Sequence, residues 1–146
     1  MTRATRIERI IAIKRLDELL ATRQLVSARR KLTEGQQLQG ELINYCDHYN
    51  HRSQQLTQRV DAGSIQRERK FSEQLGKAVE QQQSVVESQR QKVSETNQRW
   101  LLRRTQSLAT ETLLKNVQKA DALQTEKISA KEADELAQRI AQRKSR

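Results

Sequence analysis

The chain has 146 residues, of which 34% are hydrophobic and 32% are charged, and its formal net charge is +10. Leu, Ile, Val and Phe supply only 32 residues, and proline is absent. This is too little apolar surface for a wide globular core, whereas the abundant Gln, Glu, Lys, Arg, Leu and Ala favour helix. The composition excludes a compact domain and predicts a single all-α domain over residues 1–146, an elongated rod of long helices with narrow apolar stripes.

Targeting signals are missing from the sequence. It has no run of about 18 apolar residues, so we expect no direct membrane span. The stretch 7–20 is interrupted by six charged residues, which excludes a signal-peptide core. The single cysteine, Cys46, agrees with a reducing compartment, and we therefore expect a cytoplasmic protein.

The first predicted helix covers about residues 6–60, after a loose start at residues 1–5. Its first turns carry an apolar stripe that is wide for a two-stranded contact: Ile7, Ile10, Ile11, Ile13, Leu16, Leu19 and Leu20. Two interpretations remain open, an exposed contact for another protein or a locally wider seam. Gly35 and Gly40 lie within this helix and indicate a bend or a close approach of the partner helix.

The segment Asp61-Ala62-Gly63-Ser64 is the best turn signal in the chain. On either side, apolar or small residues recur at alternating spacings of four and three. The ladder before the turn is Leu42, Cys46, Tyr49, Ser53, Leu56 and Val60. The ladder after it is Leu75, Val79, Gln82, Val86, Gln89, Val93, Thr96 and Trp100. This period predicts an antiparallel two-helix coiled-coil hairpin in which Val60 faces Ile65 and Trp100 faces Leu25.

The second predicted helix covers about residues 65–125 and is less regular beyond Trp100. Leucines at 101, 102, 108, 113, 114 and 123 do not fit one ladder, so some of them must face away from the partner helix. Ser129 and Glu132 fit a capping box, which predicts a break near 125–128 and a short C-terminal helix within 129–144. A helix that continues without a break is the alternative.

The positive charge is concentrated at the two ends of the chain. Residues 1–32 carry nine Lys/Arg and three Asp/Glu, and residues 127–146 carry six and three, whereas residues 33–126 are nearly neutral. An antiparallel hairpin brings the ends together, so we expect one basic tip. Its predicted residues are Arg3, Arg6, Arg9, Ile10, Ile13, Leu136, Arg139, Ile140, Arg143 and Lys144. An acidic protein surface, an anionic membrane and nucleic acid all remain possible partners by charge alone, although no nucleic-acid-binding motif is present.

The sequence contains no catalytic or nucleotide-binding motif, so we expect no enzyme and no cofactor. The cluster of Cys46, Asp47, His48 and His51 lies on one helix, with no ligand from a second element. A zinc site needs ligands arranged around the metal, so we predict ordinary surface residues here and a seam position for Cys46.

The aromatic residues near the turn form a candidate binding patch. Tyr45 and Tyr49 are four residues apart, and Phe71 lies on the facing helix. The antiparallel pairing predicts that Tyr49 faces Leu75, Tyr45 faces Ala78 and Leu42 faces Gln82. Seam packing accounts for part of the patch, and exposed aromatics at the rim of a narrow seam are typical interface anchors.

Four segments resemble the flagellar FliJ family: 42–49, 71–81, 92–100 and Asp134-Glu135-Leu136-Ala137-Gln138-Arg139 with Arg143 and Lys144. The resemblance covers about residue 30 to the end. It implies an antiparallel coiled coil like the stalk of rotary ATPases, acting in flagellar type III protein export. The corresponding stalk of a virulence injectisome is the alternative, and a basic nucleic-acid-binding coiled coil is a more distant one.

The resemblance also implies partners and sites. The termini would enter the pore of the hexameric export ATPase, and the protein would escort empty flagellar export chaperones. The cytoplasmic domain of the export gate would bind the family's patch, which falls here on Leu38, Leu42, Tyr45, Tyr49, Phe71, Leu75, Ala78 and Gln82. At Leu38 and Gln82 this sequence departs from the family pattern, and Leu38 is interpreted as a seam residue.

Overall fold

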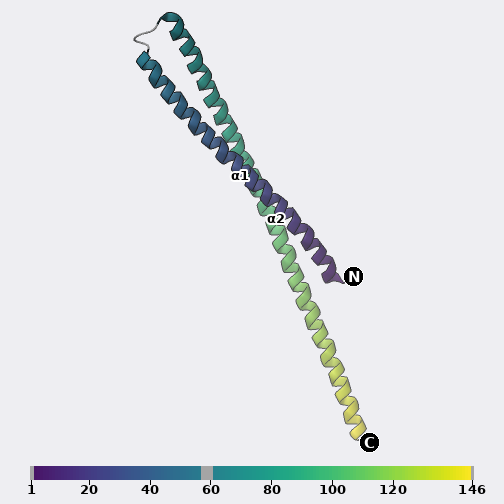
Figure 1. Cartoon of the computed structure of the whole chain (residues 1–146). Coiled ribbons are helices and arrows are strands. Elements are labelled where there is room, and N and C mark those ends of the chain that lie inside the picture. The colour runs from purple at the N-terminus through teal and green to yellow at the C-terminus, as the bar shows by residue number, and fades with distance from the viewer. Residues whose placement is uncertain (1, 57–60, 146) are drawn as a thin grey trace. The chain divides into compact units, whose positions relative to one another are not determined.

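The computed structural model describes residues 2–56 and 61–145, which form two helices, α1 (Arg3–Leu56) and α2 (Ala62–Lys144) (Figure 1). Of the described residues, only Thr2, Asp61 and Ser145 lie outside helix, and none is in a strand. The predicted all-α class and the two-helix hairpin are therefore confirmed.

The chain divides into two compact units. The hairpin unit is Leu20–Leu101, and the terminal unit joins the residues up to Leu19 with those from Leu102 onward. In the hairpin unit, the blue part of α1 and the teal-to-green part of α2 run side by side in opposite directions (Figure 1). Each unit thus pairs a segment of α1 with a segment of α2.

The seam of the hairpin unit follows the predicted spacing of four and three. The partly or fully buried residues of α1 include Ala21, Leu25, Ala28, Leu32, Gly35, Gln39, Leu42, Cys46, Tyr49 and Ser53. Those of α2 include Ile65, Glu68, Ser72, Leu75, Val79, Gln82, Val86, Gln89, Val93, Thr96 and Trp100. The ladders are confirmed from Leu42 to Ser53 and from Leu75 to Trp100. The predicted contact of Val60 with Ile65 lies outside the described residues.

The terminal unit also has a seam with spacings of three and four, but its residues are of other types. Ile7 and Ile11 pack against Val117 and Leu114. Earlier in α2, Ser107 is buried and Thr110 is partly buried. The leucines nearby, Leu102, Leu108 and Leu113, are about half exposed. The terminal unit therefore has a seam of its own, which the sequence pattern did not reveal because two of its positions carry hydroxyl side chains.

Each helix begins at a side-chain cap. The Thr5 amide donates to Thr2 Oγ1 at 3.2 Å, and the Ser64 amide donates to Asp61 Oδ1 at 3.0 Å. These oxygens satisfy amides that have no acceptor within the first helical turn. Two expectations are corrected as a result. Residues 3–5 are helical and not loose, and residues 62–64 form the first turn of α2 and not part of a loop.

The two glycines of α1 differ in their surroundings. Gly35 is buried, its carbonyl accepts a hydrogen bond from Gln82 Nε2 at 3.0 Å, and a Cβ built there would collide with Gln89 Oε1. Apart from the adjacent backbone of its own helix, no atom lies within 4 Å of the equivalent position at Gly40. The predicted close approach of α2 therefore occurs at Gly35 only.

Helix α2 runs without a break through residues 125–129 to Lys144. The predicted short C-terminal helix is therefore wrong, and Ser129 lies in mid-helix. Every described residue from 118 onward is exposed. The part of α2 that follows Val117 therefore has no packing partner among the described residues.

Candidate functional site

The predicted gate-binding residues all belong to the hairpin unit, but they occupy different positions in it. Leu38, Tyr45 and Phe71 point outward, with exposures of 46%, 55% and 39%. The other five are partly buried: Leu42, Tyr49, Leu75, Ala78 and Gln82. Leu38 is thus an exposed residue and not a seam residue, which corrects the interpretation drawn from its apolar character.

Tyr49 and Phe71 connect the seam with the exposed surface. Their ring centroids are 4.7 Å apart with an interplanar angle of 62°, an edge-to-face contact. Desolvation, together with the nearby Glu68 carboxylate and Tyr45, raises the pKa of the Tyr49 hydroxyl. The Tyr49 ring therefore supports Phe71 from the seam side, while Phe71 and Tyr45 are available for a partner.

Two contacts differ from the expected pairing, by about one helical turn at Tyr49 and by about two turns at Gln82. Tyr49 contacts Phe71, where Leu75 was predicted to face it. Gln82 donates to the Gly35 carbonyl, where it was predicted to face Leu42. The Gln82 side-chain amide therefore forms a hydrogen bond between the two helices.

The outward residues belong to two rows with a seven-residue spacing, which we call the edge rows. The α1 row is Gln24, Lys31, Leu38 and Tyr45, and the α2 row is Phe71, Ala78, Val85, Lys92 and Arg99. Residues seven apart share one face of a coiled-coil helix. Gln24, Lys31, Lys92 and Arg99 line one groove, so the two rows border the same side of the seam. Val85, 44% exposed, is an apolar member of this edge that the sequence did not single out.

The predicted tip residues lie in the terminal unit and are all exposed. Ile10, Ile13, Leu136 and Ile140 are 46%, 59%, 59% and 49% exposed. Of the wide apolar stripe at the start of α1, Ile7 and Ile11 are buried in the seam, whereas its other members are exposed: Ile10, Ile13, Leu16, Leu19 and Leu20. The basic residues near them are Arg3, Arg6, Arg9, Arg139, Arg143 and Lys144.

The two sets of tip residues are not brought together. Ile7 packs on Val117, and Leu136 follows Val117 by 19 residues, which is about 28 Å of helix. In Figure 1 the yellow end of α2 continues past the purple start of α1. The expectation of one shared tip is corrected to two basic surfaces on the terminal unit, one on each helix.

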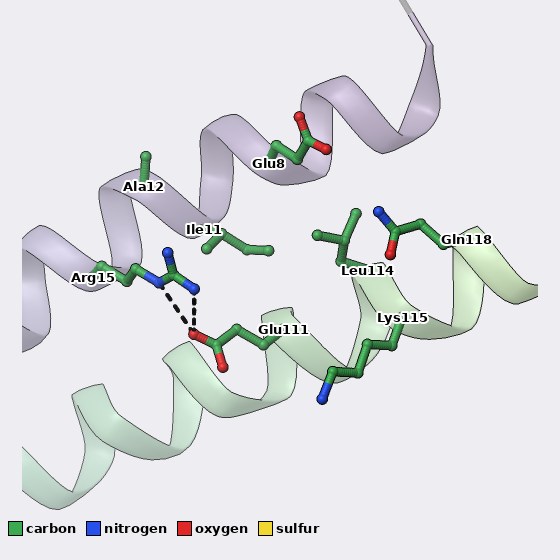
Figure 2. Close-up of a pocket in the computed structure, with 8 residues that line it drawn as sticks. All are labelled: Glu8, Ile11, Ala12, Arg15, Glu111, Leu114, Lys115 and Gln118. Atoms are coloured by element: carbon green, nitrogen blue, oxygen red, sulfur yellow. Dashed lines mark hydrogen bonds and ion pairs between the residues drawn. The ribbon is translucent and has the colours of Figure 1, made fainter.

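A groove of about 320 Å³ lies in the terminal unit between the start of α1 and residues 111–118 of α2. Arg15 Nε and Nη2 both contact Glu111 Oε1, at 3.1 and 3.0 Å, across its mouth (Figure 2). Arg104 and Glu18 form a second interhelical ion pair at 3.1 Å. The charges of Arg15 and Glu111, and of Arg104 and Glu18, are therefore paired within the chain.

The residues weighed as a metal site do not converge. Cys46 is partly buried in the seam, where its Sγ accepts a weak contact from Asn50 Nδ2 at 3.7 Å. His51 Nε2 instead contacts Gln55 Nε2 at 3.5 Å. Among the residues that the structure describes, no group of His, Cys, Asp and Glu could hold a metal ion. The same residues include no helical stretch long and apolar enough to cross a bilayer.

The predicted ladder placed Thr96 and Trp100 in the seam, but it did not predict their hydrogen bonds. The Trp100 indole donates to Thr22 Oγ1 at 2.9 Å, within one turn of the predicted partner Leu25. Thr96 is 3% exposed and donates to the Lys92 carbonyl at 2.8 Å. A hydroxyl that returns to its own backbone can occupy a seam, because it leaves no unsatisfied polar group.

Comparison with known proteins agrees with this arrangement. No curated protein and no solved structure matches the chain significantly. One family, described as the flagellar FliJ protein, matches residues 3–146, nearly the whole chain. This match covers both helices, including residues 3–30, which the segment resemblance had left out. The chain therefore belongs to the FliJ family, the stalk components of flagellar type III protein export.

Proposed function

We propose that the protein is a non-enzymatic stalk and chaperone-escort component that links the hexameric flagellar export ATPase to the export gate. The observation that carries this proposal is the family match over residues 3–146. Export would then take place at the cytoplasmic face of the inner membrane, where the protein would be peripheral. Its work would consist of binding and needs no cofactor.

The gate contact is proposed for the outward part of the patch. Leu38, Tyr45 and Phe71 expose apolar and aromatic surface on one edge of the hairpin unit. Such side chains are costly to leave in water and are common anchors of protein interfaces. Tyr49, Leu42, Leu75, Ala78 and Gln82 would position this surface, because each is partly buried between the helices.

A binding assay with the cytoplasmic domain of the gate tests this contact. Tyr45→Ala combined with Phe71→Ala should weaken binding at least tenfold, as expected when interface anchors are truncated. Ile43→Ala is the matched control, since Ile43 is 40% exposed on α1 but outside the edge rows. Equal affinities for the wild type and the double variant, with helicity unchanged, would refute the contact.

The ATPase contact is proposed for the two basic surfaces of the terminal unit. The exposed tail of α2 carries Leu136 and Ile140 beside Arg139, Arg143 and Lys144. A single helix in water is marginally stable, so a tail with exposed Leu and Ile favours enclosure by a partner. The start of α1 offers Ile10 and Ile13 beside Arg3, Arg6 and Arg9. Seated in the ring, these surfaces would stabilise the hexamer and raise its rate of hydrolysis.

Stimulation of ATP hydrolysis by the added protein tests this second contact. The triple variant Arg139→Glu, Arg143→Glu and Lys144→Glu should lose most of the stimulation, because it reverses the charge of the tail. The matched control reverses Arg67, Arg69 and Lys70, which are exposed in the hairpin unit. If the tail variant stimulates as well as the control, the tail does not act in the ring.

A further inference from the structure

The hairpin unit contains a groove of about 420 Å³ whose charged lining is entirely positive. Arg23 and Lys31 of α1 and Lys92 and Arg99 of α2 line it, and all four side chains are exposed. Ala28 and Thr96 are buried beneath them, 5% and 3% exposed. These two small seam residues leave a hollow between the helices, so the cations surround a depression and not a flat surface.

The four cations have no acidic partner in the described part of the chain. None of them takes part in any of its ion pairs. The groove of the terminal unit differs, because there Glu111 pairs with Arg15. The carboxylate of Glu95 borders Lys92 from a neighbouring hollow and does not line this groove. Like charges held close together repel one another, and an anion from outside the chain would relieve that repulsion.

The same edge continues into an exposed apolar surface. One heptad from Lys31 and Lys92, toward the turn, the edge rows carry Leu38 and Val85, which are 46% and 44% exposed. Tyr45 and Phe71 follow in the same rows. A partner lying along this edge would meet apolar side chains first and the cationic groove next.

We propose that the cationic groove is a docking site for an acidic segment of a protein partner, one that carries apolar side chains beside its carboxylates. Arg23 and Lys31 are eight residues apart and Lys92 and Arg99 are seven apart, so the cations span about 10–12 Å of each helix. Two carboxylates separated by about two helical turns would reach both ends of the groove. Charge complementarity would then set the register of the partner against the Leu38 and Val85 surface.

A protein segment fits this edge better than a nucleic acid does. Phosphate backbones gain nothing from the exposed Leu38 and Val85 side chains, and single strands need aromatic rings on which bases can stack. Among the described residues, no aromatic side chain lines the groove, and the nearby Trp100 is partly buried between the helices. This proposal concerns the groove and holds whichever partner covers the Tyr45 and Phe71 surface.

The test measures binding of a labelled helical peptide with Leu and Glu at seven-residue spacing, by fluorescence anisotropy with the full-length protein at low ionic strength. The groove variant carries Arg23→Gln, Lys31→Gln, Lys92→Gln and Arg99→Gln. The matched control has the same net charge through Arg67→Gln, Arg69→Gln, Lys70→Gln and Lys77→Gln, which are exposed outside the groove. Circular dichroism checks that both variants keep their helicity.

We expect the groove variant to bind the peptide about tenfold more weakly than the control variant, and a peptide with Gln in place of Glu to bind neither. Lys31→Glu with Lys92→Glu leaves the groove with two cations and two anions, so it should abolish the preference for the Glu peptide over a Lys peptide. If the groove variant and the control variant lose the same peptide affinity, the loss depends on net charge alone, and the proposal is overturned. Groove-dependent binding that is tighter for single-stranded DNA of equal charge, or for phosphatidylglycerol vesicles, would also overturn it. If the groove variant loses peptide binding but still binds the gate, the groove acts independently of the proposed gate contact.

Discussion

The Trp100 indole N–H donates a hydrogen bond to Thr22 Oγ1 at 2.9 Å, joining residues that are 78 apart in the sequence. Both side chains are partly buried in the hairpin unit. Because Trp100 is the only tryptophan, its fluorescence reports directly on the pairing of α1 with α2.

Thr22→Val should destabilise the hairpin unit by about 1 kcal/mol, because it leaves the partly buried indole N–H without its hydroxyl acceptor. Urea unfolding followed by tryptophan fluorescence measures this change. Thr22→Ser keeps the hydroxyl and should retain most of the stability. If Val and Ser behave alike at this position, the hydrogen bond contributes nothing.

Two adjacent valines should respond very differently to truncation. Val86 is 2% exposed and Val85 is 44% exposed. Val86→Ala removes two methyl groups from the seam and should cost about 2 kcal/mol in the free energy of unfolding. Val85→Ala should change it by less than about 0.5 kcal/mol. Thermal unfolding of both variants checks the register of α2, and similar losses would contradict it.

The glycines of α1 provide a matched pair for testing the close approach of α2. Gly40→Ala should stabilise the protein by about 0.5–1 kcal/mol, because alanine favours helix and, apart from the adjacent backbone of its own helix, nothing lies within 4 Å of its Cβ. Gly35→Ala should gain less or lose stability, because its Cβ forces the Gln89 side chain to move. Adding Gln89→Ala should restore the gain at position 35. If Gly35→Ala and Gly40→Ala increase stability equally, α2 does not approach α1 closely at Gly35.

Asp61 should make the stability of α2 depend on pH at acid values. Its hydrogen bonds with the Ser64 backbone and side chain lower the pKa of the Asp61 carboxyl below its usual 3.8. The stabilising contribution is therefore fully present above pH 3.8 and is lost as the pH falls through the lowered pKa. Asp61→Asn keeps a capping oxygen without the charge, so its Tm should fall less steeply over this range than that of the wild type. Parallel pH profiles of the two proteins would contradict this prediction.

The sequence by itself determined the two helices and most of their seam. Spacings of four and three place Leu42 to Ser53 and Leu75 to Trp100 on one face each, because helix geometry is local and depends on no other part of the chain. The family segments pointed to flagellar export for the same reason, since spacing and residue type are written in the sequence.

The tertiary structure decided which apolar residues are covered. Leu38 and Leu102 are as apolar as Leu25, yet only Leu25 is buried, since one partner helix can cover only one face. Ser107, which belongs to no predicted ladder, is buried because the pairing of the helices, and not its polarity, places it between them. The same pairing fixes where α1 starts beside α2, so it separates the basic ends that charge counting had joined. It also gathers Arg23, Lys31, Lys92 and Arg99 around one groove, although they are far apart in the sequence.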